Sequence, residues 1–428
     1  MIKKIALTAA LLTSTAGFAT PTWNRLHSQY NLSTNQHAFC FTDSNGELIG
    51  ANPHLKVRIA SVSKLATTLW AIDKKTPQFQ YETFFYFKDG HLHIKGSRDT
   101  VFSRRKLFYL VNQLNQQGIK KIDSITFDDK TIALASAEDY VGEVLTITPT
   151  RTAANLKDFL HTKEWNVLKP VYRDFINSTP ASLRDRYGLR ALEELSLDIG
   201  QVSASNTAPF DVDGSGVTKF SLLSSAIEDY MKFMNIVSNN FIADQTFENL
   251  GGEAEFDKYI ESFMNEHFKD YETKRTGFSS QEPSFKMFTG SGLNTNRNGT
   301  RVDNYASCAI IVKLIEVLDE KMQELDSVIQ KIAAVPAADG GTFRKRLNSP
   351  VLKNSIVAKT GTLFHTSALA GLVSTQKGVQ YFGIFHQLQG SKANANLIQN
   401  QMVRTLIDQG GGPKTFTYSP EYFFPVAK

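Results

Sequence analysis

One serine and one lysine stand three residues apart where an apolar helix is predicted to begin. Ser61 and Lys64 belong to the run Ile59–Thr68, and the apolar residues that follow indicate a buried helix. Because residues three apart share one face of a helix, the two side chains would lie one turn apart. Burial lowers the pKa of a lysine, since the charged form loses its water, and a neutral amine can deprotonate a serine. The spacing therefore predicts a nucleophile with its own base.

Two other copies of this spacing make the motif weak on its own. Ser103 and Lys106 lie in a cationic run that is typical of a solvated helix start, and Ser374 and Lys377 lie at a predicted hairpin turn. Ser61 itself could be a simple N-cap, because serine is favoured at that position. The choice between these interpretations depends on the rest of the chain.

The N-terminus predicts export from the cytoplasm. Residues 1–19 contain Lys3 and Lys4, then an apolar run, and end in the small-x-small form of a cleavage site. This pattern is typical of a secretory signal peptide, and it is too short to span a bilayer. No later stretch is apolar enough to be predicted as a transmembrane segment. Removing these two lysines lowers the formal charge from +5 to +3. That charge is too small to indicate binding to nucleic acid.

The cysteines and histidines of the chain limit the redox and metal chemistry that it can support. Cys40 and Cys308 are the two cysteines of an exported chain. They could form a disulfide or remain buried thiols, because the sequence does not show whether their Cα atoms are close enough. His91 and His93 share a face of a predicted strand, but zinc needs three or four ligands and no third is evident. We therefore expect no metal site and no cofactor.

The chain has 428 residues, enough for one large domain or for two to three domains of ordinary size. The predicted helices and strands that must position these side chains change in character along it. Hydrophobic content of 41% and charged content of 21% are typical of a globular protein. Strands are predicted at 37–41, 47–50, 84–87, 91–94, 122–127, 357–363, 368–373 and 379–385. Helices are predicted from 61, from 103 to 118, near 152–159 and 184–195, and over 221–237 and 306–318. The aromatic tail 410–428 either covers part of the core or forms an exposed patch.

Two further motifs follow Ser61 along the chain. Ser238 and Asn240 form an S-x-N triplet at the end of a predicted helix, and Lys359–Gly361 is the only K-T-G and lies in a predicted strand. S-x-x-K, S-D-N and K-T-G together are typical of serine β-lactamases and penicillin-binding proteins. Each motif is weak singly, but the set in this order is specific.

The chain resembles the low-molecular-mass class C penicillin-binding proteins, which are serine D-alanyl-D-alanine carboxypeptidases and endopeptidases. The resemblance covers most of residues 37–128 and 220–390, and the middle, 129–205, matches poorly. The segments that carry it are Asp43–Gly46, the Ser61 motif, Asp89–Leu92, Gly118–Ile122, Ser238–Asp244, Gly290–Leu293, Asp339–Thr342, Lys359–Leu363 and Ala370–Val373. The chain departs from the family at Asn239 and Thr289, where acids are usual.

The resemblance implies an α/β (α+β) fold. A serine β-lactamase/penicillin-binding transpeptidase-like domain, with an antiparallel sheet flanked by helices, would carry a smaller inserted α/β domain. We expect a signal peptide at 1–19, a discontinuous catalytic domain at 20–77 plus 205–428, and an accessory domain at 78–204. The third domain that the family nests within the second would be absent, because only 238 − 61 = 177 positions separate the first two motifs.

The resemblance also implies a role for each site residue. The catalytic candidates are Ser61, Lys64, Ser238, Asn240 and Lys359, and the substrate-binding candidates are Thr360, Gly361 and Thr362. The serine of the first motif would attack the carbonyl and its lysine would act as general base. Ser238 would pass the proton to the leaving amine, Asn240 would hold the substrate amide, and Lys359 would supply positive potential. The hydroxyls of Thr360 and Thr362 would bind a terminal carboxylate, and the backbone N–H groups of Ser61 and Thr362 would form an oxyanion hole.

The implied function is a periplasmic serine DD-peptidase that acts on peptidoglycan. It would remove terminal D-Ala as a carboxypeptidase, cleave D-Ala-to-diamino-acid cross-links as an endopeptidase, and be acylated by β-lactam antibiotics. Two alternatives share the fold: a β-lactamase, which would turn over a cephalosporin, and a non-catalytic peptidoglycan-binding protein. The motifs outside the three triads favour the peptidase. The balance of the two peptidase activities and the oligomeric state stay open.

Overall fold

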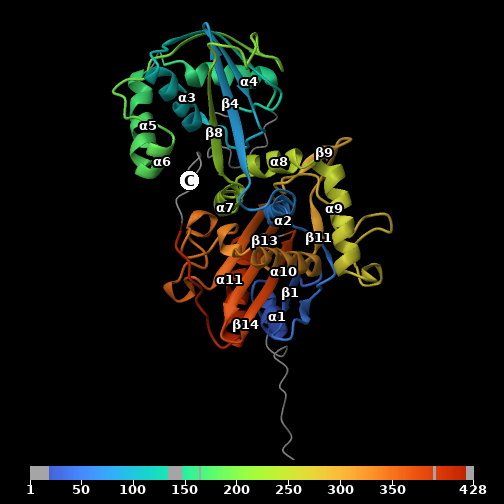
Figure 1. The fold of residues 1–428 in the computed structure, drawn as a ribbon. Coiled ribbons are helices and arrows are strands. Elements are labelled where there is room, and N and C mark those ends of the chain that lie inside the picture. Colours follow the sequence, from blue (N-terminus) through green and yellow to red (C-terminus); the bar gives the residue numbers. More distant parts are fainter. Residues whose placement is uncertain (1–18, 134–146, 163–164, 389–391, 421–428) are drawn as a thin grey trace, which may run out of the picture.

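The computed structural model describes residues 19–133, 147–162, 165–388 and 392–420, which form two lobes (Figure 1). The predicted signal peptide, apart from Ala19, lies outside these residues. Ala19 is the first residue of α1 (Ala19–Gln29), a helix that we did not predict, and it is buried. Across the described ranges, no helix is long and apolar enough to cross a membrane.

The catalytic lobe, named here for the catalytic domain predicted from the sequence, contains an antiparallel sheet covered by helices on both faces (Figure 1). In spatial order its strands are β12 (Ile356–Leu363), β13 (Thr366–Thr375), β14 (Gly378–Gln387), β1 (Ala38–Thr42) and β2 (Leu48–Ala51). Successive side chains of a strand point to opposite faces. Val357 packs in the core with α2 (Ser63–Lys75) and α10 (Cys308–Glu324), whereas Ile356 packs in the core with α1 and α11 (Lys392–Gln409). The predicted antiparallel sheet flanked by helices is confirmed.

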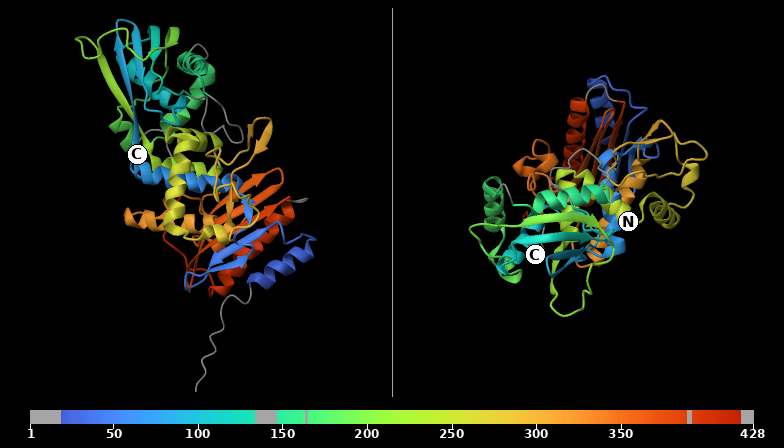
Figure 2. Two further views of the ribbon diagram at one scale, coloured as in Figure 1. Left: turned by 90° about the vertical axis from the view of Figure 1, so that its right-hand side faces the viewer. Right: turned by 90° about the horizontal axis from the view of Figure 1, so that it is seen from above.

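Further strands and helices complete this lobe. They are β3 (Lys56–Arg58), β9 (Thr295–Arg297), β10 (Thr300–Val302), β11 (Tyr305–Ser307), α7 (Ile227–Val237), α8 (Asn240–Asn249) and α9 (Gly252–His267). Strand β3 pairs antiparallel with β11 and leads directly into the Ser61 motif. Figure 2 shows α2 and α8 between the main sheet and the second lobe.

The second lobe is built on a mixed sheet. Its spatial order is β7 (Asp198–Ala204), β6 (Lys121–Phe127), β5 (His91–Lys95), β4 (Gln80–Lys88) and β8 (Thr218–Ala226). Strands β5, β6 and β7 run parallel, and β4 is antiparallel to both of its neighbours. The helices are α3 (Arg104–Gln116), α4 (Pro149–Leu160), α5 (Trp165–Ser178) and α6 (Ala181–Arg186). The described part of this lobe thus forms one α/β unit with its own core.

Two of our secondary-structure predictions in this region are wrong. The helix predicted over 221–237 begins only at Ile227, because residues 218–226 form β8 and pair with β4. The accessory sheet therefore continues past the predicted limit at 204. The helix predicted near 184–195 ends at Arg186, and the apolar residues after it enter the core as irregular chain. In both places apolar spacing alone did not distinguish a helix from another buried conformation.

The second serine–lysine pair is not solvated as we predicted. Lys106 is fully buried, and its Nζ donates to the carboxylate of Asp99 and, at 2.6 Å, to the hydroxyl of Tyr230. The Tyr230 hydroxyl donates in turn to Asp99 at 2.7 Å. Within the described chain, the buried Oγ of Ser103 has no hydrogen-bond partner. This lysine therefore compensates a buried carboxylate and does not contact its serine.

The structure decides two questions that the sequence left open. Cys40 in β1 and Cys308 at the start of α10 form a disulfide with a Cα–Cα distance of 6.0 Å. In the tail, Phe416 and Tyr418 pack against the main core, so the described part of the tail covers the core. The tail's aromatic residues beyond 420 lie outside the described residues.

Candidate active site

Ser61 lies in the short 3₁₀ turn Ala60–Val62 that leads into α2. Ala60 has a φ of 47°, in the left-handed region that alanine rarely adopts. The turn is held from both sides: the Ser63 hydroxyl donates to the Ala60 carbonyl at 2.7 Å, and Asn304 Nδ2 donates to the Ser63 hydroxyl at 3.0 Å. A left-handed alanine persists only where its surroundings fix it. These contacts therefore place Ser61 at the open end of a rigid helix.

Lys64 is the centre of a hydrogen-bond network. Its Nζ lies 3.0 Å from the Oγ of Ser61, 2.7 Å from the Oδ1 of Asn240 and 2.8 Å from the carbonyl oxygen of Ser291. Lys64 is completely buried, and this burial lowers the pKa of its amine to about 7. A substantial share of the amine is therefore neutral near pH 7. A neutral amine within hydrogen-bond reach of a serine hydroxyl is a suitable general base.

Asp244 opposes the effect of burial on Lys64, and we did not predict this role. Its negative charge raises the pKa of the lysine, although burial has the larger effect. Asp244 accepts a hydrogen bond from the backbone N–H of Ser291 at 2.8 Å, and burial raises the pKa of its own carboxyl. Asn240 and Asp244 stand four residues apart on α8, so they share a helix face. This four-residue spacing, within the Ser238–Asp244 segment that carried the family resemblance, is the feature of the sequence that could have predicted the role of Asp244.

Ser238 and Lys359 form the second pair of the site. Helix α7 ends at Ser238, which has a left-handed φ of 59°, and the side chain of Asn239 then caps α8 by accepting the N–H of Ile242 at 2.9 Å. Lys359 Nζ donates to the Ser238 hydroxyl and to the Thr360 carbonyl, both at 2.9 Å. Burial and the charge of the neighbouring catalytic lysine hold the pKa of Lys359 well below its usual range.

Strand β12 presents its outer edge to Ser61. At this edge the N–H of Ala358 donates to the Ala334 carbonyl at 2.9 Å. Backbone groups alternate between the two edges of an antiparallel strand, so the N–H of Thr362, four residues on, points to the same outer edge. Gly361 packs so closely that a Cβ atom there would lie 3.1 Å from the backbone nitrogen of Ser61. This close approach brings the edge to which the N–H of Thr362 points against the turn that carries Ser61.

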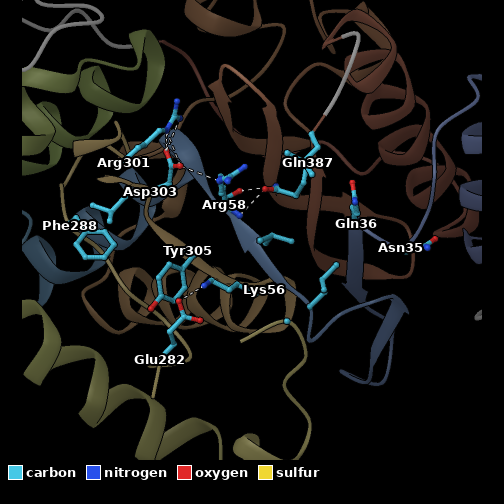
Figure 3. Close-up of a pocket in the computed structure, with 15 residues that line it drawn as sticks. Asn35, Gln36, Lys56, Arg58, Glu282, Phe288, Arg301, Asp303, Tyr305 and Gln387 are labelled. Atoms are coloured by element: carbon cyan, nitrogen blue, oxygen red, sulfur yellow. Dashed lines mark hydrogen bonds and ion pairs between the residues drawn. The ribbon is translucent and has the colours of Figure 1, made fainter. Parts of the chain in front are cut away.

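A groove of about 700 Å³ opens beside β3, the strand that leads into Ser61 (Figure 3). Two guanidinium groups share one carboxylate in its wall: Arg58 lies 3.1 Å and Arg301 lies 2.9 Å from the oxygens of Asp303. Both arginine side chains remain close to half exposed. The other wall residues include the ion pair Lys56–Glu282 and Phe288, Tyr305 and Gln387. Three cations face two carboxylates, so this set carries one net positive charge.

The arrangement brings together six of the residues that we predicted for the site: Ser61, Lys64, Ser238, Asn240, Lys359 and Gly361. Lys64 contacts Ser61 and Asn240, Lys359 contacts Ser238, and Gly361 approaches the turn that carries the serine. Fold and site together define a serine peptidase of the penicillin-binding class. The chain belongs to the D-Ala-D-Ala carboxypeptidase 3 (S13) family, which matches residues 24–142 and 210–409. The resemblance that we described is therefore confirmed, and the unmatched stretch 143–209 overlaps the part that it did not cover.

Solved structures support this assignment. Bd3459, a predatory peptidoglycan endopeptidase from Bdellovibrio bacteriovorus, is 27% identical with a TM-score of 0.76, and the match covers 91% of this chain and 96% of that one. A form of Bd3459 acylated by penicillin G, in complex with the immunity protein Bd3460, gives 27% identity, a TM-score of 0.73 and coverage of 91% and 97%. Penicillin-binding protein 4 (dacB) from Haemophilus influenzae shares the fold at 16% identity and a TM-score of 0.58, with coverage of 90% and 99%. No curated protein sequence gave a significant match.

Proposed function

We propose that this chain hydrolyses D-alanyl peptide bonds in the stem peptides of peptidoglycan through an acyl-enzyme on Ser61. The observation that carries the proposal is the 3.0 Å contact between the Ser61 hydroxyl and Lys64, whose burial lowers its pKa to about 7. Neutral Lys64 takes the hydroxyl proton while Oγ attacks the carbonyl carbon. The tetrahedral oxyanion accepts hydrogen bonds from the N–H groups of Ser61 and Thr362.

Collapse of this intermediate needs a proton on the leaving amine. Ser238 is suited to relay the proton that the lysine base took from the serine nucleophile, because its hydroxyl can accept a proton as it gives up its own, and Lys359 holds this hydroxyl at 2.9 Å. Asn240 already contacts the lysine of the first motif and can hold the substrate amide. A substrate carboxylate next to Lys359, accepted by the hydroxyls of Thr360 and Thr362, favours the charged form of this lysine. Water then releases the acyl group.

We also propose that the enzyme cleaves cross-links as well as terminal D-Ala. A cross-linked peptide has bulk on both sides of the scissile bond, so its site must be open at both ends. The groove beside β3 supports this proposal, because β3 leads into the turn that carries Ser61 and the groove offers Arg58 and Arg301 to the carboxylates of stem peptides, although no residue of that turn lines it. The name of Bd3459, the 27% identical endopeptidase, favours the same activity.

Location in the periplasm is part of the same proposal. The disulfide between Cys40 and Cys308 supports it, because disulfides persist in oxidising compartments such as the bacterial periplasm. The signal sequence predicted at 1–19 points the same way. Isolating the protein from periplasmic extracts, and mapping the first residue of the secreted chain, tests this part.

Covalent labelling with a fluorescent penicillin tests the nucleophile. Ser61→Ala should abolish labelling, whereas Ser103→Ala and Ser374→Ala should label normally. Ser103 is a matched control, because a buried lysine, Lys106, also follows it by three residues. Persistent labelling of Ser61→Ala would show that another residue is acylated.

Digestion of purified muropeptides tests the substrate. We expect monomeric pentapeptides to lose D-Ala and cross-linked dimers to become monomers at comparable rates. Loss of pentapeptides alone, with dimers and intact sacculi untouched, would remove the endopeptidase proposal. Steady turnover of a chromogenic cephalosporin would instead indicate the β-lactamase, and the absence of any product would indicate the non-catalytic binding protein.

A further inference from the structure

The C-terminal strap, residues Pro413–Pro420, runs across the catalytic lobe and ends beside α7 (Figure 1). Two backbone-linked contacts hold it there. The N–H of Phe416 donates to the carbonyl of Asn354 at 2.8 Å, and the side-chain amide of Asn354 donates to the carbonyl of Tyr418 at 2.8 Å. The strap therefore has a defined path that delivers the Tyr418 side chain to the base of α7.

Tyr418 completes a buried polar network at that point. Its hydroxyl donates to one oxygen of Asp339, and the other oxygen accepts Lys232 Nζ at 2.7 Å and the N–H of Val335 at 2.6 Å. Lys232 also donates to two carbonyls of the 330–333 turn, and its Nζ lies 4.6 Å from the centre of the Tyr418 ring. The Asp339 side chain is only 2% exposed. Buried networks of this kind hold their members rigidly when every member is satisfied.

The loop that carries Asp339 contacts α7 at two places, one turn apart. Lys232 of this helix pairs with Asp339, and the carbonyl of Ile236, one turn further, lies against Gly341. A Cβ atom on Gly341 would come within 2.2 Å of that carbonyl oxygen, and the φ of Gly341 is 55°, so glycine is required for this approach. Helix α7 ends one residue after Ile236, and Ser238 follows as its C-cap.

Ser238 depends on its surroundings for its conformation. Its φ of 59° is left-handed, a conformation that non-glycine residues rarely adopt. Such residues stay in place only where neighbouring structure over-determines them. The loop at 339–341 fixes the turn before Ser238 from one side, and Lys359 holds its hydroxyl from the other.

We propose that Tyr418 is a positioning residue for Ser238, acting through Asp339 and the last turn of α7. This inference rests on the proposed function, in which Ser238 passes a proton to the leaving amine. The strap would then set the geometry of leaving-group protonation without touching substrate. Its removal should slow the steps that need this proton and spare the steps that do not.

Leaving-group chemistry separates this role from a merely structural one. An amide substrate expels an amine, which must be protonated, whereas a thioester of the same acyl group expels a thiolate, which leaves without a proton. Tyr418→Phe removes only the hydroxyl. We expect kcat on the D-Ala-D-Ala amide to fall about tenfold and kcat on the matching thioester to change less than about twofold, because small displacements of a catalytic group carry rate costs of this size. A general loss of stability would lower both rates equally.

Three further variants make the outcome decisive. Tyr381→Phe is the matched control, since the Tyr381 hydroxyl donates to buried Asp319 at 2.8 Å, and it should leave the amide-to-thioester ratio unchanged. Ser238→Ala should lower the ratio more than Tyr418→Phe. If Tyr418→Phe fails to fold, Asp339→Asn tests the same network, because it keeps the shape of the side chain at position 339 and removes its charge.

Each result supports or overturns a separate claim. A normal ratio in Ser238→Ala overturns the role of Ser238 in the proposed function, and the positioning role of Tyr418 with it. A lowered ratio in Ser238→Ala together with a normal ratio in Tyr418→Phe overturns the positioning role alone.

Discussion

Replacing Asp244 with asparagine should shift the acid limb of the pH–rate profile for penicillin acylation to lower pH. The pKa of Lys64 is lowered by burial and raised by the charge of Asp244, and the net value is about 7. Asparagine keeps an oxygen for the N–H of Ser291, which Asp244 accepts at 2.8 Å, but it removes the charge. Burial then acts alone, so the pKa of Lys64 falls further. Because acylation needs the neutral amine, the variant should stay active in more acidic solution.

The size of the effect follows from the charge that is removed. Loss of a nearby opposite charge lowers a pKa by roughly one or more, or about 1.4 kcal/mol in the free energy of protonation. Burial raises the pKa of Asp244 itself to about 6, so at pH 6 its carboxyl is only about half charged and the effect of removing it is reduced. For a drop of about one, the neutral fraction of Lys64 at pH 6 rises from roughly a tenth to about half, which is the upper limit. Acylation at pH 6 should therefore be up to about fivefold faster than in the wild type, with little difference at pH 8.

The assay is the rate of labelling by fluorescent penicillin between pH 5.5 and 9. Asp319→Asn serves as the control, because burial also raises the pKa of Asp319 but its partner is Tyr381, away from Lys64. This control should leave the limb in place. An acid limb that stays fixed in Asp244→Asn, or moves to higher pH, would refute the account of Lys64 as a base tuned by burial against one carboxylate.

Three predictions concern stability, each measured by urea unfolding. Lys106→Met leaves Asp99 buried without its cation and should cost about 3–5 kcal/mol, and wild-type stability in this variant would contradict the buried ion pair. Replacing Cys40 and Cys308 together by alanine frees a link between residues 268 positions apart and should cost about 2–5 kcal/mol, whereas the same change under reducing conditions should cost little. Burial lowers the pKa of His37 from 6.5 to about 4, with a smaller contribution from the charge of a neighbouring histidine. The unfolded chain therefore binds a proton at His37 more readily than the folded chain does. As a result, the free energy of unfolding should fall as the pH drops from about 6.5 toward 4. His37→Asn should flatten that fall, and an equally steep fall in the variant would exclude His37 as its source.

Local patterns accounted for much of the fold. Alternating or continuous apolar runs between turn residues predicted the strands β1, β2, β12, β13 and β14. A strand or hairpin of this kind can be recognised from a short stretch of sequence. The same patterns did not distinguish β8 from the start of α7, because residues 218–226 become a strand only by pairing with β4. The predicted helix therefore started six residues too early, for a reason that lies outside its own segment, in the neighbouring strand.

The sequence by itself determined the chemistry that is available: a serine and a lysine one turn apart, an S-x-N triplet and a single K-T-G. Only the tertiary structure decided which lysine is poised as a base. Lys64 and Lys106 have the same spacing from a serine and the same complete burial, but Lys106 directly pairs with Asp99, whereas Lys64 contacts Ser61, Asn240 and a backbone carbonyl. A pKa depends on every charge and dipole within a few ångströms, and most of those groups come from distant parts of the chain. Spacing can therefore propose a catalytic pair, but its electrostatic environment is set by the fold.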